Sequence, residues 1–191
     1  LSVMDWAVRQ KDEKIRNLLL QQEKRDKERI ESQKLLAAVR KNDYALVQKL
    51  VKAGSDVNQV AKDGNTPLLI ASKYGYTKIV KVLLENGANP NKVDRLMKAT
   101  PGHKAAFFGN TEIMKLLVKH GLNMDAIGPY NGYTALHDSL LNSHIETSIV
   151  LIKAGASTNI EGVDGKTALD IAKERKLSGI IELIEKLKKK N

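Results

Sequence analysis

The chain has 191 residues, of which 42% are hydrophobic and 28% charged, and it contains no cysteine. This composition is typical of a folded protein with a sizeable core, and the lack of cysteine excludes disulfides, thiolate catalysis and sulfur-ligated metal sites. Thirty-two basic against 22 acidic residues give a net charge of +10, which favours an acidic partner. No apolar run approaches the ~20 residues of a membrane-spanning helix, so we expect no membrane insertion.

Residues 1–31 are predicted to form a charged helical extension or linker. Residues 21–29 are polar with mixed charge, as in a solvated helix. One alternative is a helix that runs directly into the following repeat at Leu35 and shields its apolar end; another is a coiled-coil arm, for which sustained heptads are absent. The segment carries a thin apolar stripe, namely Ile15, Leu18, Leu19 and Ile30. A further apolar set could dock onto the array or onto a partner: Leu1, Met4, Trp6 and Val8.

From about residue 32 the sequence repeats with a period of 33 or 34 residues. One series is a leucine followed four residues later by a glycine, at Leu50 and Gly54, Leu83 and Gly87, Leu117 and Gly121, and Leu151 and Gly155. A second series keeps the same spacing: Thr66, Thr100, Thr134 and Thr167. A fixed period of this length indicates one small unit stacked several times.

Each threonine predicts the start of a short first helix. Its side-chain oxygen can accept a free backbone N–H at the N-cap, and Pro67 and Pro101 follow at the first helical position, where proline is tolerated. Small residues one turn later let neighbouring helices approach closely: Ala71, Ala105, Ser139 and Ala172. The break after this helix falls at Gly75 and Gly109, and in the other units at Asn42, Ser143 and Lys176.

A second helix is predicted after each break. Apolar residues at helical spacing mark two of these helices, with Ile79, Val80, Leu83 and Leu84 in one and Ile113, Met114, Leu117 and Val118 in the next. The glycine that follows is expected to be a left-handed C-cap. Asp-Gly or Asn-Gly pairs at 63–64, 131–132 and 164–165 predict tight turns between units. Since helices this short barely form alone in water, stacking must stabilise them.

These strings resemble the ankyrin repeat family, whose units begin with a Thr-Pro-Leu-His-like string and end with a Leu-Leu-x-x-Gly-Ala-like string. The first strings here read TPLLIA, TPGHKA, TALHDS and TALDIA. The resemblance covers about residues 32–190 and implies an all-α solenoid of five helix-turn-helix units, at 32–59, 60–92, 93–126, 127–159 and 160–191, behind the extension 1–31. It also implies turns that project from one edge, and a concave face of first helices and turns that binds other proteins.

Residues that could carry chemistry are explained by the repeat. His103 and His137 each follow a threonine by three residues, which indicates a stabilising hydrogen bond to a turn rather than catalysis. His120 lies in the last turn of a helix, where a cation suits the dipole. Ser139 stands where other units have alanine, and no glycine-rich phosphate loop or metal-ligand spacing is present. We therefore predict no enzyme, no metal site and no cofactor.

The basic end of the chain has two interpretations. Lysines at positions 186 and 188–190 could form a nucleic-acid or nuclear-import patch. A polar cap on the terminal repeat is favoured, because such a cap is required for solubility and lysines in a last helical turn complement the dipole. The sequence therefore argues against nucleic acid as the partner.

Only eight residues are aromatic, and five of them are expected in one patch on the concave face. Tyr130 and Tyr133 flank a turn, and Tyr74, Phe107 and Phe108 end first helices. Alternatively, the phenylalanines belong partly to the core and the tyrosines only cover a turn. The predicted partner-binding residues are Lys62, Asp63, Asn65, Lys73, Tyr74, Leu96, Met97, Phe107, Phe108, Tyr130, Asn131, Tyr133, Leu141 and Asn142.

Unit three departs from the repeat at Gly102, where units two, four and five have Leu68, Leu136 and Leu169. The missing side chain implies either that a bulky neighbour such as Met97 fills the space or that the unit is soft. We expect the second outcome, a flexible centre that adjusts around a ligand.

The sequence predicts a protein–protein interaction module, an adaptor or scaffold, that holds an acidic peptide or domain on the concave face of units two to four. Lysines around the patch, including Lys73, Lys98 and Lys104, would steer that partner. The alternatives are a binder of an anionic ligand or nucleic acid, with steep salt dependence, and a methyl-lysine reader with an aromatic cage, which the net charge disfavours. We expect an intracellular protein, in the cytoplasm, the nucleus or, for a bacterial effector, a host cell, and either a monomer or part of a larger complex.

Overall fold

The computed structural model describes residues 2–5, 13–128 and 130–189, and within these ranges all regular secondary structure is helical. Leu1, Trp6 and Val8, for which docking was considered, lie outside the described residues. In the part of the chain that is described, no helix combines the length and the apolarity needed to cross a membrane.

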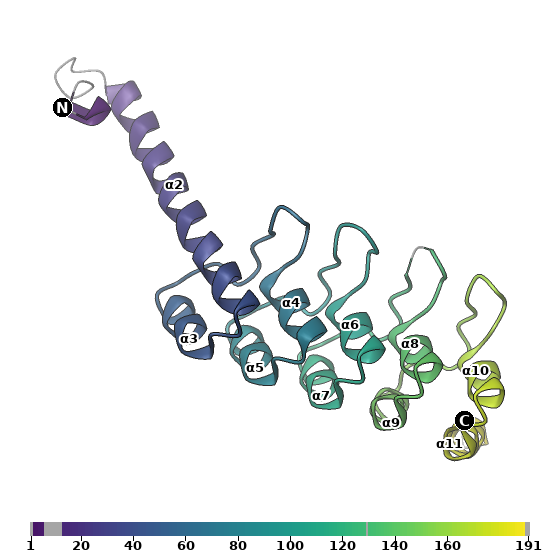
Figure 1. Cartoon of the computed structure of the whole chain (residues 1–191). Coiled ribbons are helices and arrows are strands. Elements are labelled where there is room, and N and C mark those ends of the chain that lie inside the picture. Colours follow the sequence, from purple (N-terminus) through teal and green to yellow (C-terminus); the bar gives the residue numbers. More distant parts are fainter. Residues whose placement is uncertain (1, 6–12, 129, 190–191) are drawn as a thin grey trace.

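The described helices form five antiparallel pairs in one row (Figure 1). The last turns of α2 (Glu13–Arg40) pair with α3 (Tyr44–Lys52). The following pairs are α4 (Pro67–Tyr74) with α5 (Thr77–Glu85), α6 (Pro101–Phe107) with α7 (Thr111–Lys119), α8 (Ala135–Leu141) with α9 (Ile145–Lys153), and α10 (Ala168–Glu174) with α11 (Ser178–Lys188). The first helices make one layer, the second helices make another, and the loops between units project on one side. The predicted all-α solenoid of five units with a helical extension is confirmed.

The threonine series begins the first helices as predicted. The side-chain oxygens of Thr66, Thr100 and Thr167 accept hydrogen bonds from backbone amides three residues later, at 3.2–3.3 Å. Each helix then reverses direction through one residue in the left-handed region. Asn42, Ser143 and Lys176 adopt φ values of 55–56° in the slot that Gly75 and Gly109 occupy elsewhere, so the predicted breaks are also confirmed.

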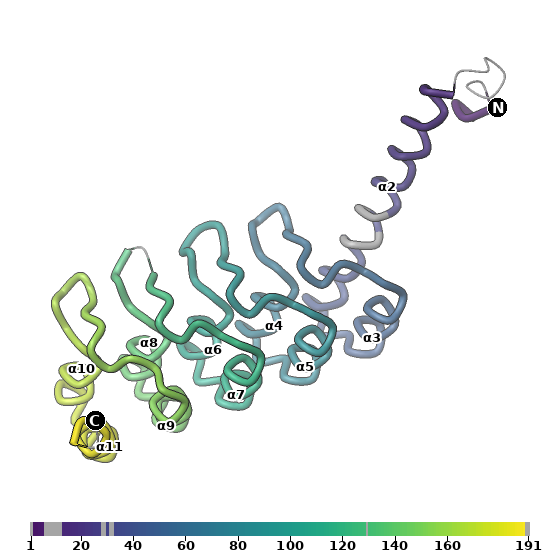
Figure 2. The backbone as a smooth tube through the Cα atoms, turned by 180° about the vertical axis from the view of Figure 1, so that it is seen from behind, coloured from purple at the N-terminus to yellow at the C-terminus, as the bar shows by residue number. Residues whose placement is uncertain are grey.

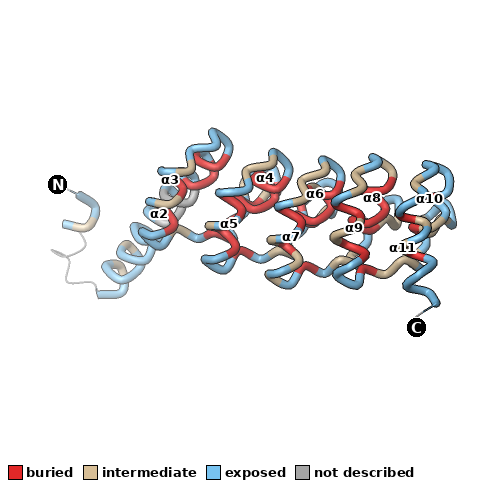
Figure 3. The backbone as a smooth tube through the Cα atoms, turned by 90° about the horizontal axis from the view of Figure 1, so that it is seen from below, coloured by how far each residue is buried: buried red, intermediate tan, exposed pale blue. Residues whose placement is uncertain are grey.

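The core lies between the two helical layers (Figure 3). The leucines of the first repeating series, Leu50, Leu83, Leu117 and Leu151, are all buried there. Buried side chains from successive units touch one another in a single hydrophobic cluster that runs from α2 to α11. Each unit therefore completes its core only against its neighbours, which is the stacking that helices this short require.

A loop asparagine connects unit one to unit two, and another connects unit two to unit three. Asn58 accepts a hydrogen bond from the amide of Asn89 at 2.7 Å and donates one to the carbonyl of Gly87 at 2.9 Å. Asn91 repeats both bonds one unit later, with Asn123 and Gly121. Asn58 and Asn91, which stand 33 residues apart, are thus inter-unit connectors.

The space expected at Gly102 is filled, so the premise of a soft third unit is wrong. A Cβ atom added at Gly102 would lie 2.7 Å from a methyl carbon of Leu122, which is buried. Met97, the neighbour considered for this role, is instead 55% exposed. Units two and four carry the opposite arrangement, a leucine in the first helix and an alanine (Ala88, Ala156) after the second.

Helix α2 projects well beyond the array (Figures 1 and 2). Leu35, Ala38 and Val39 near its end are buried in the first unit, so the helix runs directly into the repeats. From Glu13 to Lys34, every side chain that the structure describes is exposed or partly exposed. The projecting part therefore contributes little to the shared core.

Candidate binding groove

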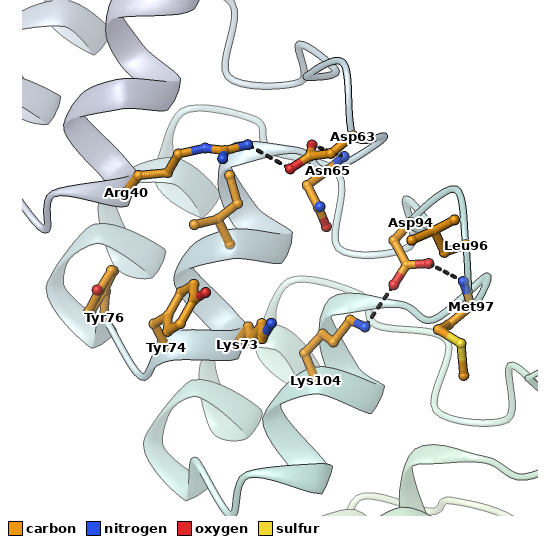
Figure 4. Close-up of a pocket in the computed structure, with 11 residues that line it drawn as sticks. Arg40, Asp63, Asn65, Lys73, Tyr74, Tyr76, Asp94, Leu96, Met97 and Lys104 are labelled. Carbon is orange, nitrogen blue, oxygen red and sulfur yellow. Dashed lines mark hydrogen bonds and ion pairs between the residues drawn. The ribbon is translucent and has the colours of Figure 1, made fainter.

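The first helices and the loops line a groove with two adjoining hollows. The first hollow, of about 570 Å³, lies among α2, α4, α6 and the loops of units two and three (Figure 4). The second, of about 350 Å³, lies mainly between α6 and α8. The first is lined by Arg40, Asp63, Asn65, Ile70, Lys73, Tyr74, Tyr76, Asp94, Leu96, Met97 and Lys104. The second is lined by Lys73, Met97, Ala99, His103, Lys104, Phe107, Phe108, Gly128, Asn131 and Asp138.

Ion pairs hold two loops against the helices of the groove (Figure 4). Arg40 of α2 binds Asp63 with 2.7 Å between Nη2 and Oδ2, and Lys104 of α6 binds Asp94 with 2.7 Å between Nζ and Oδ2. Burial opposes the ionisation of Asp94, but the hydrogen bonds from Lys104 and from the amide of Met97 hold its pKa below the usual value. These charges are satisfied within the protein and shape the groove.

The loop of unit three presents apolar side chains at the edge of the groove. Leu96 is 72% exposed and Met97 55%. The next residue, Lys98, has φ 49°, in the slot where the other loops have Gly64, Gly132 and Gly165. A non-glycine residue is uncommon in this conformation. Asp94 supports it, because its Oδ1 accepts the Met97 amide at 2.6 Å.

Phe107 and Phe108 stand side by side where α6 ends. Their ring centroids are 5.1 Å apart with the planes at 73°, an edge-to-face arrangement. Phe107 is 49% exposed and Phe108 46%. About half of each side chain therefore faces solvent, so neither ring is a core residue.

Tyr74 of α4 adds a third exposed aromatic ring. The ring of Tyr74 stacks on the ring of Tyr76 with 5.8 Å between their centroids. The Nζ of Lys73 lies 5.2 Å from the centroid of the Tyr74 ring. These rings line the first hollow, whereas the phenylalanines line the second. Lys73, Met97 and Lys104 line both, so the two hollows meet at these residues.

Two of the predicted tyrosines lie outside both hollows. Tyr133 donates a hydrogen bond to Asp164 Oδ2 at 2.7 Å, which raises the pKa of the phenol, and its ring stacks on His137 with 5.1 Å between centroids. Tyr130 is exposed and donates to the Leu96 carbonyl at 3.2 Å. Tyr133 thus connects neighbouring units, so substituting it would not separate binding from stability.

The other predicted site residues also divide into those that line one of the two hollows and those that do not. Those that line a hollow are Asp63, Asn65, Lys73, Tyr74, Leu96, Met97, Phe107, Phe108 and Asn131. Three further residues do not: Lys62 is exposed in its loop, Leu141 packs against the core, and Asn142 ends α8 with its side chain bonded to the Asp138 carbonyl.

The sequence analysis missed Arg40, Asp94 and Asp138 as groove residues. Four residues after the N-cap threonines, the first helices carry Ile70, Lys104, Asp138 and Ile171. Lys104 and Asp138 are charged at a repeat position that holds isoleucine in units two and five, and this departure could have identified Asp138 from the sequence. Asp94 and Arg40 belong to no repeating series, so the sequence offered no such signal for them.

Asp138 has the most unusual environment in the groove. It is only partly exposed, and its carboxyl group accepts no hydrogen bond from any residue that the structure describes. Burial raises its pKa to about 7, against an opposing effect of the Lys104 charge. The carboxyl group is therefore divided between its neutral and charged forms near neutral pH.

His103 and His137 are structural, as predicted. The Nδ1 of each accepts the backbone N–H of the threonine three residues earlier, at 3.2 Å. Each Nε2 therefore donates to a carbonyl of the next unit, at 3.1 Å from Tyr133 O and Ile160 O respectively. Burial lowers the pKa of both rings. Among the described residues, no group of three or more His, Asp or Glu is placed to hold a metal ion.

Comparison with known proteins points to one family. A family model described as ankyrin repeats, in three copies, matches residues 3–94, 35–127 and 92–162. An inactive serine/threonine-protein kinase of Bos taurus is 41% identical over 70 residues, 36% of this chain and 5% of that protein. A putative ankyrin repeat protein of fowlpox virus is 42% identical over 60 residues, 30% of this chain and 18% of that protein. A glycerophosphocholine phosphodiesterase of Schizosaccharomyces pombe is 43% identical over 60 residues, 31% of this chain and 5% of that protein. The matched segments thus span less than a fifth of each relative.

Proposed function

Because the chain belongs to the ankyrin repeat family, whose repeats are generally protein–protein interaction modules, we propose that it binds a protein segment in the groove of units two to four. The observation that carries this proposal is the pair of half-exposed phenylalanines, Phe107 and Phe108, which line one hollow together with the exposed Met97. Exposed apolar clusters of this kind mark interaction sites. Aromatic anchors near the centre of an interface supply most of its binding energy.

The charges around the groove favour an acidic partner. Lys104 and Arg40 are engaged with Asp94 and Asp63, so they shape the loops rather than attract a ligand. Lys73 and the exposed Lys98 have no carboxylate partner among the described residues. Together with the net charge of +10, they would speed the approach of an acidic segment and leave the apolar contacts to hold it.

The test is affinity capture followed by a direct binding measurement. Wild-type protein is compared with the double variant Phe107→Ala/Phe108→Ala, and with Leu18→Ala on α2, a 57% exposed apolar residue outside the groove, as control. For a partner retained by the wild type and by the control, the double variant should bind at least about 30-fold more weakly, since truncating a hot spot costs ~2 kcal/mol or more. Its melting temperature should stay within about 3 °C of the wild type, because half-exposed rings contribute little to the core.

Two results would contradict the proposal. One is a partner that the double variant retains with unchanged affinity. The other is a partner lost equally from the Leu18→Ala control. A salt titration of the binding affinity distinguishes a protein ligand from a nucleic acid. An affinity that falls by several powers of ten between 50 and 200 mM salt would indicate a nucleic acid.

A further inference from the structure

The second hollow combines aromatic rings with a carboxyl group that accepts no hydrogen bond from any residue the structure describes. Asp138 on α8 lines it together with Met97, Phe107 and Phe108. The other acids of the groove, the buried Asp94 and the exposed Asp63, have side-chain donors: Asp94 accepts from Lys104 and the Met97 amide, and Asp63 accepts from Arg40. Asp138 has none among the described residues. A partly exposed carboxylate without a protein donor depends on water for its hydrogen bonds, so covering it with an apolar ligand would cost free energy.

Several titratable groups of the second hollow and of the elements packed against α8 have partners, whereas Lys73, which also lines the hollow, has no carboxylate partner among the described residues. On α6, Lys104 is ion-paired with Asp94, and His103 donates to the Tyr133 carbonyl. Before α9, the His144 ring is hydrogen-bonded to the Phe107 carbonyl. On α10, the carboxylate of Asp170 accepts from Thr167. None of these groups donates a hydrogen bond to Asp138, so its carboxylate is open to a donor from a ligand.

We infer that the second hollow binds one positively charged side chain of the partner, a guanidinium or ammonium group that Asp138 and the two phenylalanines recognise together. The inference rests on the proposed function and deepens it, because it names the chemistry of an anchor residue within an otherwise acidic segment. A cation donates a charge-assisted hydrogen bond to the carboxylate and is attracted to the faces of the aromatic rings. A neutral apolar side chain would gain only the contact with the rings, and an acidic one would be repelled. At about 350 Å³ the hollow is within the range of small-ligand sites.

The probe is n-butylguanidinium, with n-butanol as the uncharged comparison. Binding is followed by the amide and side-chain carbon NMR shifts of the full chain in 0.15 M salt, where charges more than ~8 Å away are largely screened. The guanidinium compound should cause saturable shifts at Phe107, Phe108 and Asp138, and the alcohol should bind at least about tenfold more weakly. Alcohol binding as tight as that of the cation would overturn the inference.

Variants assign the effect to the hollow. Asp138→Asn removes the charge at nearly constant shape and should weaken binding of the guanidinium probe by about tenfold or more. Phe108→Ala keeps the carboxylate but removes one ring, and should weaken it about threefold. Glu146→Gln, which removes an exposed charge on α9, is the matched control and should bind as the wild type does. Equal binding by Asp138→Asn and the wild type would overturn the inference.

The pH dependence gives an independent readout. Because Asp138 must be ionised to bind a cation and titrates at about 7, probe affinity should rise about tenfold from pH 6 to pH 8, and Asp138→Asn should show no such rise. A flat profile for the wild type would contradict the inference. These experiments use no protein partner, so their failure leaves the proposed function standing. Conversely, if the proposed function is wrong but the hollow binds the probe, only the capture experiment would fail.

Discussion

Buried titratable side chains act on the stability of this protein in opposite directions. The pKa of His103 and of His137 is lowered by burial, so the stability they contribute is present above about pH 6.5 and lost as the pH falls. The pKa of Asp138 is raised to about 7, so ionising it costs stability as the pH rises from about 4 to 7. The measured profile of the wild type is the sum of both effects, and only variants separate them.

The histidine contribution can be isolated with His103→Gln/His137→Gln. Glutamine preserves a capping box with the preceding threonine but loses the bonds to Tyr133 O and Ile160 O. At pH 7.5 this variant should be less stable than the wild type by about 1–2 kcal/mol, since each bond is worth roughly 1 kcal/mol. Below pH 5.5 the difference in free energy of unfolding between this variant and the wild type should disappear. A protonated Nδ1 can no longer accept the hydrogen bond from the threonine backbone N–H, so the wild type loses the stability that the histidines contribute.

Urea denaturation at the two pH values provides the measurement. Thr66→Ala, which removes an N-cap in the unit where Leu69 replaces the histidine, serves as the control. It should cost about 1 kcal/mol at both pH values. An unchanged gap between wild type and histidine variant at the lower pH would refute the assigned protonation of the rings.

At the scale of the element, the third unit shows how two positions exchange volume. Gly102 and Leu122 occupy the places that hold leucine and alanine in units two and four, and Leu122 fills the space above the glycine. Either change alone should therefore be damaging. Leu122→Ala opens a cavity at a cost of about 2–4 kcal/mol, and Gly102→Leu overpacks the site at about 1–3 kcal/mol.

The double variant Gly102→Leu/Leu122→Ala restores the arrangement of the neighbouring units. Its free energy of unfolding should lie within about 1 kcal/mol of the wild type, which makes the coupling energy in a double-mutant cycle at least about 2 kcal/mol. Urea denaturation of the four proteins measures that coupling. Additive losses would mean that Leu122 does not complement Gly102.

This exchange also shows where sequence reasoning reached its limit. The helix starts, the reversals at Asn42, Ser143 and Lys176 and the buried leucines follow from local chemistry repeated at a fixed period, so they could be predicted. Leu122 stood out from Ala88 and Ala156 in the sequence, but its contact with Gly102 depends on how the end of one helix folds back on another.

The groove was less predictable for the same reason. The exposure of Phe107 and Phe108 could be anticipated because they end a short helix. Tyr133 was predicted as a binding residue because it flanks a turn, whereas its bond to Asp164, 31 residues away, had no signal in the sequence. Arg40 was overlooked because it pairs with Asp63 across 23 residues. Such pairs depend on loop geometry, which a period alone does not specify.

At the scale of the whole molecule, the shared core begins at Leu35. A chain that starts at residue 32, the boundary proposed from the sequence, should keep its free energy of unfolding within about 1 kcal/mol of the full chain, because the described side chains removed are exposed or partly exposed. The added change Leu35→Ala should then cost about 2–5 kcal/mol. Thermal and urea denaturation measure both. A large loss from the truncation alone would show that the first 31 residues support the array.

Helix α2 is continuous from its exposed start into the first unit, with no break in the 28 residues from Glu13 to Arg40. At 1.5 Å per residue it is a rod about 40 Å long. Because its last turns are embedded in the array and Arg40 lines the first hollow, the direction of the rod is set relative to the groove. The distance from a spectroscopic label near residue 13 to a second label on a captured segment would consequently report the direction in which that segment runs along the groove.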